Sequence, residues 1–425
     1  CFILYLRWAS RPPVGKWSPL KAIINTMEVA LVIKELIEVY GDFVKFWLGP
    51  DLNVVVSPTW RKHRKIASPN YGKRTIEGYS DVFNAEVDLL LNVLRATNGE
   101  KINVYEPIVR CTSYSVCRTC DLQALTHIFV PSLYDLVFDR MTKWYLQIDP
   151  LYWLTKYHRT ANKYRSILSE FSCRIIKLRL EHIERTGENM KHIVDESEDD
   201  VKNTQLSVID RFILSQELDA HELADETFTV FTSSQEASAK ISSAILLMLA
   251  YNPRCQDKLY TEIRSVIGDA DRAVTNEDLN QMPYLEMVFK EAIRMFPIGA
   301  MLQRTVAEDM TTASGTIPAG SALVVPIYHM QRDPRFWKNP NDFDPERFTQ
   351  ENSKGRHPHC YIPFSLGSMD CLGRYFGPKL IKTICVRVLR EFRAVAVDSY
   401  EDLKVTIAIS ASPINGYPLK LVPRG

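Results

Sequence analysis

Neither sign of charge is in excess in this sequence. Its 425 residues include 52 lysines and arginines and 51 aspartates and glutamates. Bulk binding of nucleic acid needs a basic surplus, and an acidic disordered chain needs the opposite, so the balance argues against both classes. A chain of this length can bury a sizeable core, which favours a folded globular protein.

Long apolar runs are also missing. A transmembrane helix needs about 20 consecutive apolar residues. The chain begins with the six apolar residues Cys-Phe-Ile-Leu-Tyr-Leu, and a second apolar run covers residues 241–250. Both are too short to span a bilayer. We interpret residues 1–10 as the remnant of an N-terminal membrane anchor and residues 241–250 as part of a buried core helix.

The cysteines show no sign of a disulfide framework. There are nine of them, an odd number, and their spacing has no regular rhythm. This usage favours a reducing compartment and mostly unpaired thiols. The sequence also contains no internal repeat and no low-complexity segment, which argues against a solenoid or an extended linker.

Two short motifs invite a metal or redox interpretation that their surroundings do not support. Cys117 and Cys120 form a C-x-x-C, and His357, His359 and Cys360 lie in one short stretch. A zinc or redox site needs a second ligand pair or a strand-turn context, and the sequence offers neither nearby. We therefore predict ordinary helical cysteines at the first motif and no metal at the second.

The most informative stretch is residues 364–373, Phe-Ser-Leu-Gly-Ser-Met-Asp-Cys-Leu-Gly. Gly367 and Gly373 permit tight turns that bring main chain close to a ligand. Residues 379–392 carry apolar side chains at helical spacing, so we expect Cys371 just before a helix N-terminus. The N–H groups and dipole there favour a thiolate, which is a good axial ligand for iron. The alternative is a buried structural cysteine.

A basic helix is predicted to begin at Trp60-Arg-Lys-His-Arg-Lys65. Trp60 and Arg64 are four residues apart, so their side chains lie on one side of the helix. An indole N–H and a guanidinium can together hold a carboxylate. The alternative is a solvated basic face; nucleic-acid binding is disfavoured because the chain as a whole has no basic excess.

A long helix is predicted over residues 221–249, with an apolar stripe along one side. The polar patch Thr232–Ser238 interrupts this stripe in the middle. Such a patch in a central helix marks a place where a ligand or water interrupts the packing. The alternative is a surface-facing turn of the helix.

Several charged residues precede the cysteine loop in the second half of the chain. Glu291 and Arg294 are three residues apart on a predicted helix, so they can pair. Arg304 follows one strand later, and Arg347 lies in the segment Pro345–Phe348. A lone pair of this kind is a weak signal, because most are surface pairs. The Glu291–Arg294 pair becomes informative because it precedes the cysteine loop in the sequence.

Strands are predicted near both ends of the chain. Residues 43–47 and 52–56 read as one hairpin. Residues 407–412 and 419–422 read as strands closing a small C-terminal sheet, with Asn415-Gly416 as the turn between them.

These motifs resemble, in order and spacing, those of the cytochrome P450 family, over nearly the whole chain from about residue 11. The cysteine loop matches the family pattern Phe-x-x-Gly-x-x-x-Cys-x-Gly, although Met369 stands where the family usually has arginine. The segment Phe-Trp-Leu-Gly-Pro and the helix with Trp60 look most like family 4, the animal lipid-handling group.

The resemblance implies a mainly α fold with a small β region, forming a single haem domain over residues 11–425. Haem b would lie between the helix at 221–249 and the cysteine loop, with Cys371 as the iron ligand. The residues implied to hold the haem and shape its loop are Trp60, Arg64, Arg304, Phe364, Gly367 and Gly373. Glu291, Arg294 and Arg347 would form a buried trio that fixes the segment presenting the cysteine.

The central helix departs from the family pattern. The family has an acid followed by threonine where this chain has Gln235 and Glu236. Thr232 replaces a glutamate that family 4 members often join to haem, so we expect no ester link. Glu236, or Ser233 or Ser234 through water, is expected to supply the proton that O2 activation requires.

Two further departures concern the haem site. Met369 removes one cationic hydrogen bond to a propionate, worth about 1.5–3 kcal/mol. Asp370 is expected to raise the pKa of the neighbouring Cys371 thiol by like-charge repulsion. In addition, three residues separate Val56 from Trp60, where the family has another helix and a long loop.

The implied activity is a monooxygenase that inserts one oxygen atom of O2 into a C–H bond of a small apolar substrate. Fatty acids, terpenoids or hormones, and xenobiotics fit equally. Electrons would come from NADPH-cytochrome P450 reductase, with cytochrome b5 as a further candidate, docking on the basic face at Arg61, Lys62 and Lys65. The implied location is the endoplasmic reticulum membrane, with the catalytic domain on the cytoplasmic face and no nucleic-acid partner.

Two alternatives stay open at this point. One is a degenerate relative that folds, with or without haem, and does not oxygenate. The other is a haem-thiolate isomerase or lyase, which needs no proton relay to O2. In each case an apolar pocket would be lined by Phe231, Ser234, residues 298–302 and Ile409.

Overall fold

The computed structural model describes residues 58–119, 139–140, 143–186, 207–312 and 315–424. The anchor remnant, the predicted hairpin at 43–56 and the short connection before Trp60 lie outside these residues. Within the described part of the chain, no helix is long and apolar enough to cross a membrane.

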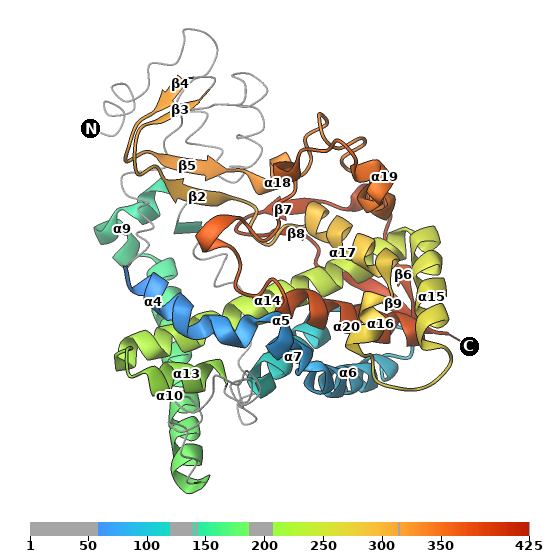
Figure 1. Ribbon diagram of the computed structural model, residues 1–425, viewed down its shortest axis with the longest axis horizontal. Helices are drawn as coiled ribbons and strands as arrows, with labels where there is room; N and C mark the ends of the chain where they lie inside the picture. Colours follow the sequence, from blue (N-terminus) through green and yellow to red (C-terminus); the bar gives the residue numbers. More distant parts are fainter. Residues whose placement is uncertain (1–57, 120–138, 141–142, 187–206, 313–314, 425) are drawn as a thin grey trace.

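Helices dominate the described chain (Figure 1). The first half contains α4 (Pro58–Ala67), α5 (Lys73–Glu77), α6 (Ser80–Arg95), α7 (Tyr105–Thr119), α9 (Asp149–Trp153), α10 (Lys156–Thr186) and α13 (Val208–Ser215). The second half contains α14 (Ala220–Tyr251), α15 (Pro253–Ile267), α16 (Asn276–Asn280), α17 (Pro283–Met295), α18 (Ile327–Met330), α19 (Gln350–Ser353) and α20 (Phe376–Glu391). Short 3-10 helices are η2 (Ser68–Tyr71), η3 (Trp144–Gln147), η4 (Pro345–Phe348), η5 (Pro358–Cys360), η6 (Gly367–Met369) and η7 (Tyr400–Asp402).

The strands form small antiparallel sheets. They are β1 (Lys101–Asn103), β2 (Leu302–Thr305), β3 (Met310–Thr312), β4 (Gly315–Ile317), β5 (Ala322–Val325), β6 (Phe392–Ala396), β7 (Val405–Ile407), β8 (Ala411–Pro413) and β9 (Pro418–Pro423). The sheet orders are β1-β9-β6, β2-β5, β3-β4 and β7-β8. The mainly α fold with a small β region is thus as predicted.

One strand pairing differs from the prediction. The turn at Asn415-Gly416 joins β8 to β9, but these strands belong to different sheets: β8 pairs with β7, and β9 pairs with β1 and β6. Asn103 and its neighbour Val104 are the reason. Asn103 Oδ1 accepts from the N–H of Tyr417 at 3.1 Å, and Val104 N donates to the Tyr417 carbonyl at 3.2 Å. These contacts draw the chain away from β8 directly after the turn.

Helix α14 runs through the middle of the molecule (Figure 1). It begins at a capping box in which Asp219 Oδ1 accepts from the N–H groups of His221 and Glu222, both at 2.8 Å. Pro253 opens α15 directly after its C-terminal Asn252. All of residues 241–250 are buried, so the prediction of a core helix there is confirmed.

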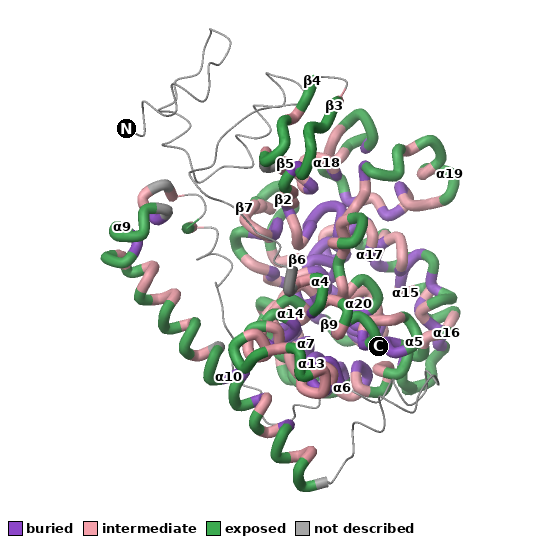
Figure 2. Tube along the Cα trace, turned by 60° about the vertical axis from the view of Figure 1, so that its left-hand side comes forward, coloured by how far each residue is buried: buried purple, intermediate pink, exposed green. Residues whose placement is uncertain are grey.

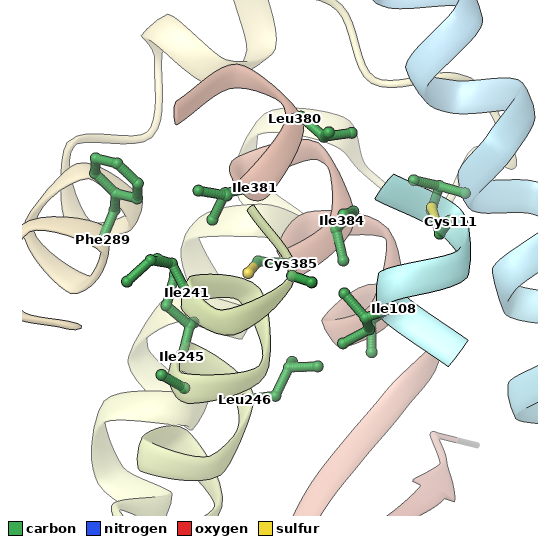
Figure 3. Packing of buried hydrophobic residues seen from close by; sticks show 14 of the residues in the cluster. Ile108, Cys111, Ile241, Ile245, Leu246, Phe289, Leu380, Ile381, Ile384 and Cys385 are labelled. Atoms are coloured by element: carbon green, nitrogen blue, oxygen red, sulfur yellow. The ribbon is translucent and has the colours of Figure 1, made fainter. Parts of the chain in front are cut away.

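The main core forms where α7, α14, α17 and α20 meet (Figure 3). Ile245, Ile384 and Cys385 are among its fully enclosed side chains. Burying one such aliphatic side chain contributes about 1.5–3 kcal/mol. In Figure 2 the buried segments cluster along α14 and α20, while α10 extends outward with one exposed side. The core therefore fixes α14 against the start of α20, which follows the cysteine loop.

Candidate functional site

The cysteine loop is closed by its own main chain. Cys371 N donates to the carbonyl oxygen of Phe364 at 2.8 Å, and Asp370 N donates to that of Gly367 at 3.1 Å. Gly367 has a φ of +80° and Ser365 has a φ of +64°. A non-glycine residue in this left-handed region costs about 1–2 kcal/mol. The loop is therefore held in a strained conformation that turns the chain back and presents Cys371.

Gly373 has a different role from the predicted one. Its backbone does not adopt a positive φ, and a Cβ there would lie 3.8 Å from the Cys371 sulfur. Its N–H is instead directed at that sulfur and lowers the pKa of the thiol. The absence of a side chain at Gly373 leaves the space beside the sulfur open, and its backbone does not need the left-handed conformation that favours glycine.

The groups around Cys371 act on the pKa of its thiol in both directions. Burial raises the pKa of Cys371, and the charge of Asp370 adds to this rise as expected. The Gly373 N–H and the guanidiniums of Arg64 and Arg374 act in the opposite direction without reversing it. Cys371 is an exposed residue, which limits how far burial can act. Helix α20 begins at Phe376, so Cys371 precedes its N-terminus, as expected.

Helix α4 brings Trp60 and Arg64 to the loop. The Arg64 guanidinium lies 5.9 Å from the centre of the Trp60 ring. Its Nη1 donates to the Asp370 carbonyl oxygen and its Nη2 to Asp370 Oδ1, both at 2.7 Å. The predicted Trp60–Arg64 pair thus lies against the residue that precedes Cys371.

Arg304 approaches the same loop from strand β2. Its Nη2 donates to Ser365 Oγ at 3.0 Å, and its Nη1 donates to the carbonyl of Gln303 at 2.9 Å. Two guanidiniums, from α4 and from β2, therefore contact the cysteine loop. Such groups bind carboxylates through charge-assisted hydrogen bonds.

The polar patch of α14 is partly open to solvent. Glu236 Oε1 lies 2.6 Å from Lys240 Nζ, one turn further along, with side chains 22% and 18% exposed. Lys240 Nζ donates to Ser410 Oγ at 2.7 Å, in the turn between β7 and β8. The main chain of that turn also bonds to the segment after α17, where Ala300 N donates to the Ile409 carbonyl at 2.8 Å. The β7–β8 turn thus contacts α14 through Lys240 and the segment after α17 through Ala300.

The other residues of the patch are placed differently. Ser233 is exposed and its Oγ donates back to the Thr229 carbonyl at 2.6 Å. Ser234 is half-buried. The predicted pocket residue Phe231 lies in the core, where its ring centre is 4.7 Å from that of Phe171. Among the polar residues proposed for proton supply, Glu236 is the one that the structure joins to the β7–β8 hairpin.

The trio of Glu291, Arg294 and Arg347 is brought together in the interior. Glu291 accepts from Arg294 at 2.6 and 2.8 Å and from Arg347 Nε at 3.3 Å. Arg294 also donates to main-chain carbonyls at 331, 340 and 342, on the irregular segment before η4. The buried ring of Trp337 lies 5.2 Å from its guanidinium. One buried carboxylate thus ties α17 to the chain that leads into the cysteine loop.

The described residues contain no group of three or more side chains that could hold a metal ion. Cys117 is buried, and burial raises its pKa to about 12, while Cys120 lies outside the described residues. Every cysteine in the described part of the chain is a free thiol. The prediction of unpaired thiols is confirmed to that extent.

Sequence reasoning missed two basic residues at the site, Lys240 and Arg374. Lys240 pairs with Glu236, and Arg374 pairs with the second carboxylate oxygen of Asp370. Both pairs are four residues apart on the chain. This spacing is the ordinary signature of a helical ion pair, so it was available in the sequence.

Comparison with known proteins identifies the family. A model of the family described as "Cytochrome P450" matches residues 37–405. Cytochrome P450 4c3 of Drosophila melanogaster is 30% identical over 402 residues, which cover 90% of this chain and 75% of that protein. Cytochrome P450 4V2 of Rattus norvegicus is 29% identical over 425 residues, covering 96% and 81%. Human cytochrome P450 4X1 is 28% identical over 390 residues, covering 88% and 75%. The predicted resemblance to family 4 is confirmed.

The described residues fit the haem b that the family carries with a cysteine thiolate ligand. The Cys371 thiol is exposed on a closed loop, and glycine at 373 leaves space beside the sulfur. Arg64, Arg304 and Trp60 supply cationic and N–H donors around that loop, as two propionates require. This donor set can hold the haem from its cysteine side.

Replacing the shared carboxylate of the trio, Glu291→Gln, is expected to lower the free energy of unfolding by about 3–5 kcal/mol, because it leaves buried guanidiniums without a counter-charge. Thermal and urea unfolding of the haem-loaded protein would measure the loss. Glu286→Gln, on the same helix, is the matched control. Glu286 pairs with Lys290 and Lys382 and is 38% exposed, so its loss should stay below about 1 kcal/mol. Equal losses in the two variants would contradict the buried-network interpretation.

Proposed function

The chain belongs to the cytochrome P450 family, and we propose that this haem-thiolate monooxygenase inserts one oxygen atom of O2 into a C–H bond of a small, largely apolar substrate. Fatty acids, terpenoids or hormones, and xenobiotics are the substrate classes that we propose. The observation that carries the proposal is the closed loop that presents Cys371 with Arg64 and Arg304 against it.

The proposed roles at the haem follow from these contacts. A thiolate-ligated haem activates O2, because the thiolate donates electron density to the iron. Cys371 would hold the iron. The Gly373 N–H, which lowers the pKa of this thiol, would stabilise the thiolate by a hydrogen bond. Arg64, Arg304 and Trp60 would bind the propionates. Phe364 and Gly367 would keep the loop closed through their carbonyl groups.

We propose that Glu236 supplies protons that O2 activation requires. A carboxylate in contact with an ammonium, as Glu236 is with Lys240, can exchange a proton with it and with ordered water. Ser410 holds Lys240 in place from the β7–β8 turn. Ser234, half-buried on the same helix, would act through water; Ser233 is the weaker candidate because its hydroxyl is bonded to its own helix.

The proposed electron donor is NADPH-cytochrome P450 reductase, with cytochrome b5 as a second donor. The proposed docking surface is the exposed side of α4, which carries Arg61, Lys62 and Lys65. An acidic partner would compete there with Glu217, which lies 3.2 Å from Lys62 Nζ. We propose a location on the cytoplasmic face of the endoplasmic reticulum membrane, with residues 1–10 as the end of an anchor and residues 11–425 as the haem domain.

One observation favours a second candidate function, a haem-thiolate isomerase or lyase. Glu236 is already paired with a cation, so the helix lacks the free acid–threonine arrangement of the family. An isomerase or lyase acts on an oxygenated substrate and needs no proton relay to O2. NADPH-dependent consumption of O2 with formation of a hydroxylated product would separate the two functions.

The carbon monoxide difference spectrum of the reduced protein tests the haem assignment directly. We expect a red-shifted Soret band of the thiolate type for the natural chain. Cys371→His should abolish that band, because imidazole cannot replace the thiolate electronically. Cys385→Ser is the matched control, since Cys385 is enclosed in the core away from the loop (Figure 3). A natural chain without haem, or with a histidine-type band, would overturn the proposed function.

Glu236→Gln tests the proton role. We expect product formation to fall by about 100-fold or more, because general acid-base groups contribute roughly that much, while the carbon monoxide spectrum stays unchanged. Product formed per NADPH consumed is the measurement. Asp225→Asn is the control, because Asp225 lies on the exposed first turns of the same helix and pairs with His221. Unchanged turnover in Glu236→Gln would remove Glu236 from the mechanism and leave the haem assignment intact.

A further inference from the structure

We propose that Asp370 is a positioning residue that fixes Arg64 at the haem edge, and that Arg374 balances the charge of Asp370, so that Arg64, Asp370 and Arg374 together carry one net positive charge. The inference rests on the haem-thiolate function proposed above. It accounts for Met369, the neutral residue that stands where the resemblance leads one to expect arginine.

The link between Arg64 and Asp370 is specific in its geometry. Two nitrogens of one guanidinium bond to two different groups of one residue: the main-chain carbonyl and the carboxylate, each at 2.7 Å. The two residues are 306 positions apart in the chain, so the link joins α4 to the cysteine loop. Their side chains are 22% and 16% exposed, which shields the pair from solvent more than an ordinary surface pair.

This double contact sets the direction of the guanidinium. A planar guanidinium held at two nitrogens cannot rotate freely, and its remaining N–H groups keep one orientation. A propionate that binds to a pre-oriented donor loses less conformational entropy in the complex than one that must order a free side chain. Asp370 would therefore act on the haem through Arg64, without touching the haem itself.

Arg374 completes the charge balance. It follows Asp370 by four residues and contacts the other oxygen of the Asp370 carboxylate. Two guanidiniums and one carboxylate leave one net positive charge beside Cys371. With Met369 uncharged, the pair of Arg64 and Asp370 alone would carry no net charge. Arg374 thus restores the charge that the usual arginine at 369 would have provided.

Fixed charge near a haem iron changes its reduction potential, because a positive neighbour favours the reduced, less positive iron. Charge-changing variants of the loop therefore give a readout that a purely structural role would not produce. Asp370→Asn raises the local charge by one unit, Arg374→Gln lowers it by one, and the double variant returns it to its natural value.

The experiment measures two quantities on the purified haem-loaded protein. The reduction potential should rise in Asp370→Asn, fall in Arg374→Gln and return close to the natural value in the double variant. The rate of haem transfer to apomyoglobin should increase about tenfold or more in Asp370→Asn and in the double variant, because both free Arg64, and far less in Arg374→Gln. Arg264→Gln, which removes an exposed guanidinium paired with Asp269, is the control and should change neither quantity.

The possible failures are distinguishable. A natural chain that takes up no haem overturns the proposed function and this inference together. If all variants take up haem and have the same reduction potential, the proposed role of Arg374 in balancing the charge of Asp370 is overturned. Haem uptake with an unchanged transfer rate in Asp370→Asn overturns the positioning role. If Asp370→Asn does not fold, Arg374→Gln alone decides the charge balance, and Arg64→Gln should then reproduce the faster haem loss if the positioning role holds.

Discussion

The buried carboxylate of Glu291 is the constraint on which the site depends. It pairs with two guanidiniums, those of Arg294 and Arg347, and these in turn donate to main-chain carbonyls of the irregular segment before the cysteine loop. That segment has little regular secondary structure of its own. A buried charge network takes the place of a strand or helix ladder there, because an unpaired charge in the interior would be far more costly than the paired one.

The network holds the segment that precedes the cysteine loop, while the loop itself is closed by its own main-chain hydrogen bonds and contacted by guanidiniums from other elements. Arg64 reaches it from α4 and Arg304 from β2, while burial raises the pKa of the Cys371 thiol and the two nearby guanidiniums, Arg64 and Arg374, lower it. The main-chain conformation of the loop therefore presents Cys371 as a metal ligand before any metal is bound. The positive charge of a bound iron would favour the thiolate form of Cys371, since metal binding releases the thiol proton.

Local patterns in the sequence were enough to predict the long helices, the core run at 241–250 and the order of the haem-site motifs. Contacts between distant segments were not predictable in the same way. Asn415-Gly416 has good turn chemistry, yet β9 pairs with β1 because of Asn103, more than 300 positions earlier. The ring of Phe231 packs against Phe171 of α10, a contact between distant segments that no local pattern indicates. Spacing identifies a face of a helix and not what covers that face.

The two altered motifs share one physical feature. Glu236 on α14 and Asp370 before the cysteine each place a carboxylate at a partly buried position, and each has a basic residue four positions later that pairs with it. An acid introduced alone at such a site would destabilise the fold and repel the propionates or the thiolate. Lys240 and Arg374 remove that penalty. Charge compensation of this kind lets the fold and the haem edge tolerate residues that depart from the family pattern, so the departures at these sites argue for an altered proton supply more strongly than for a lost haem site.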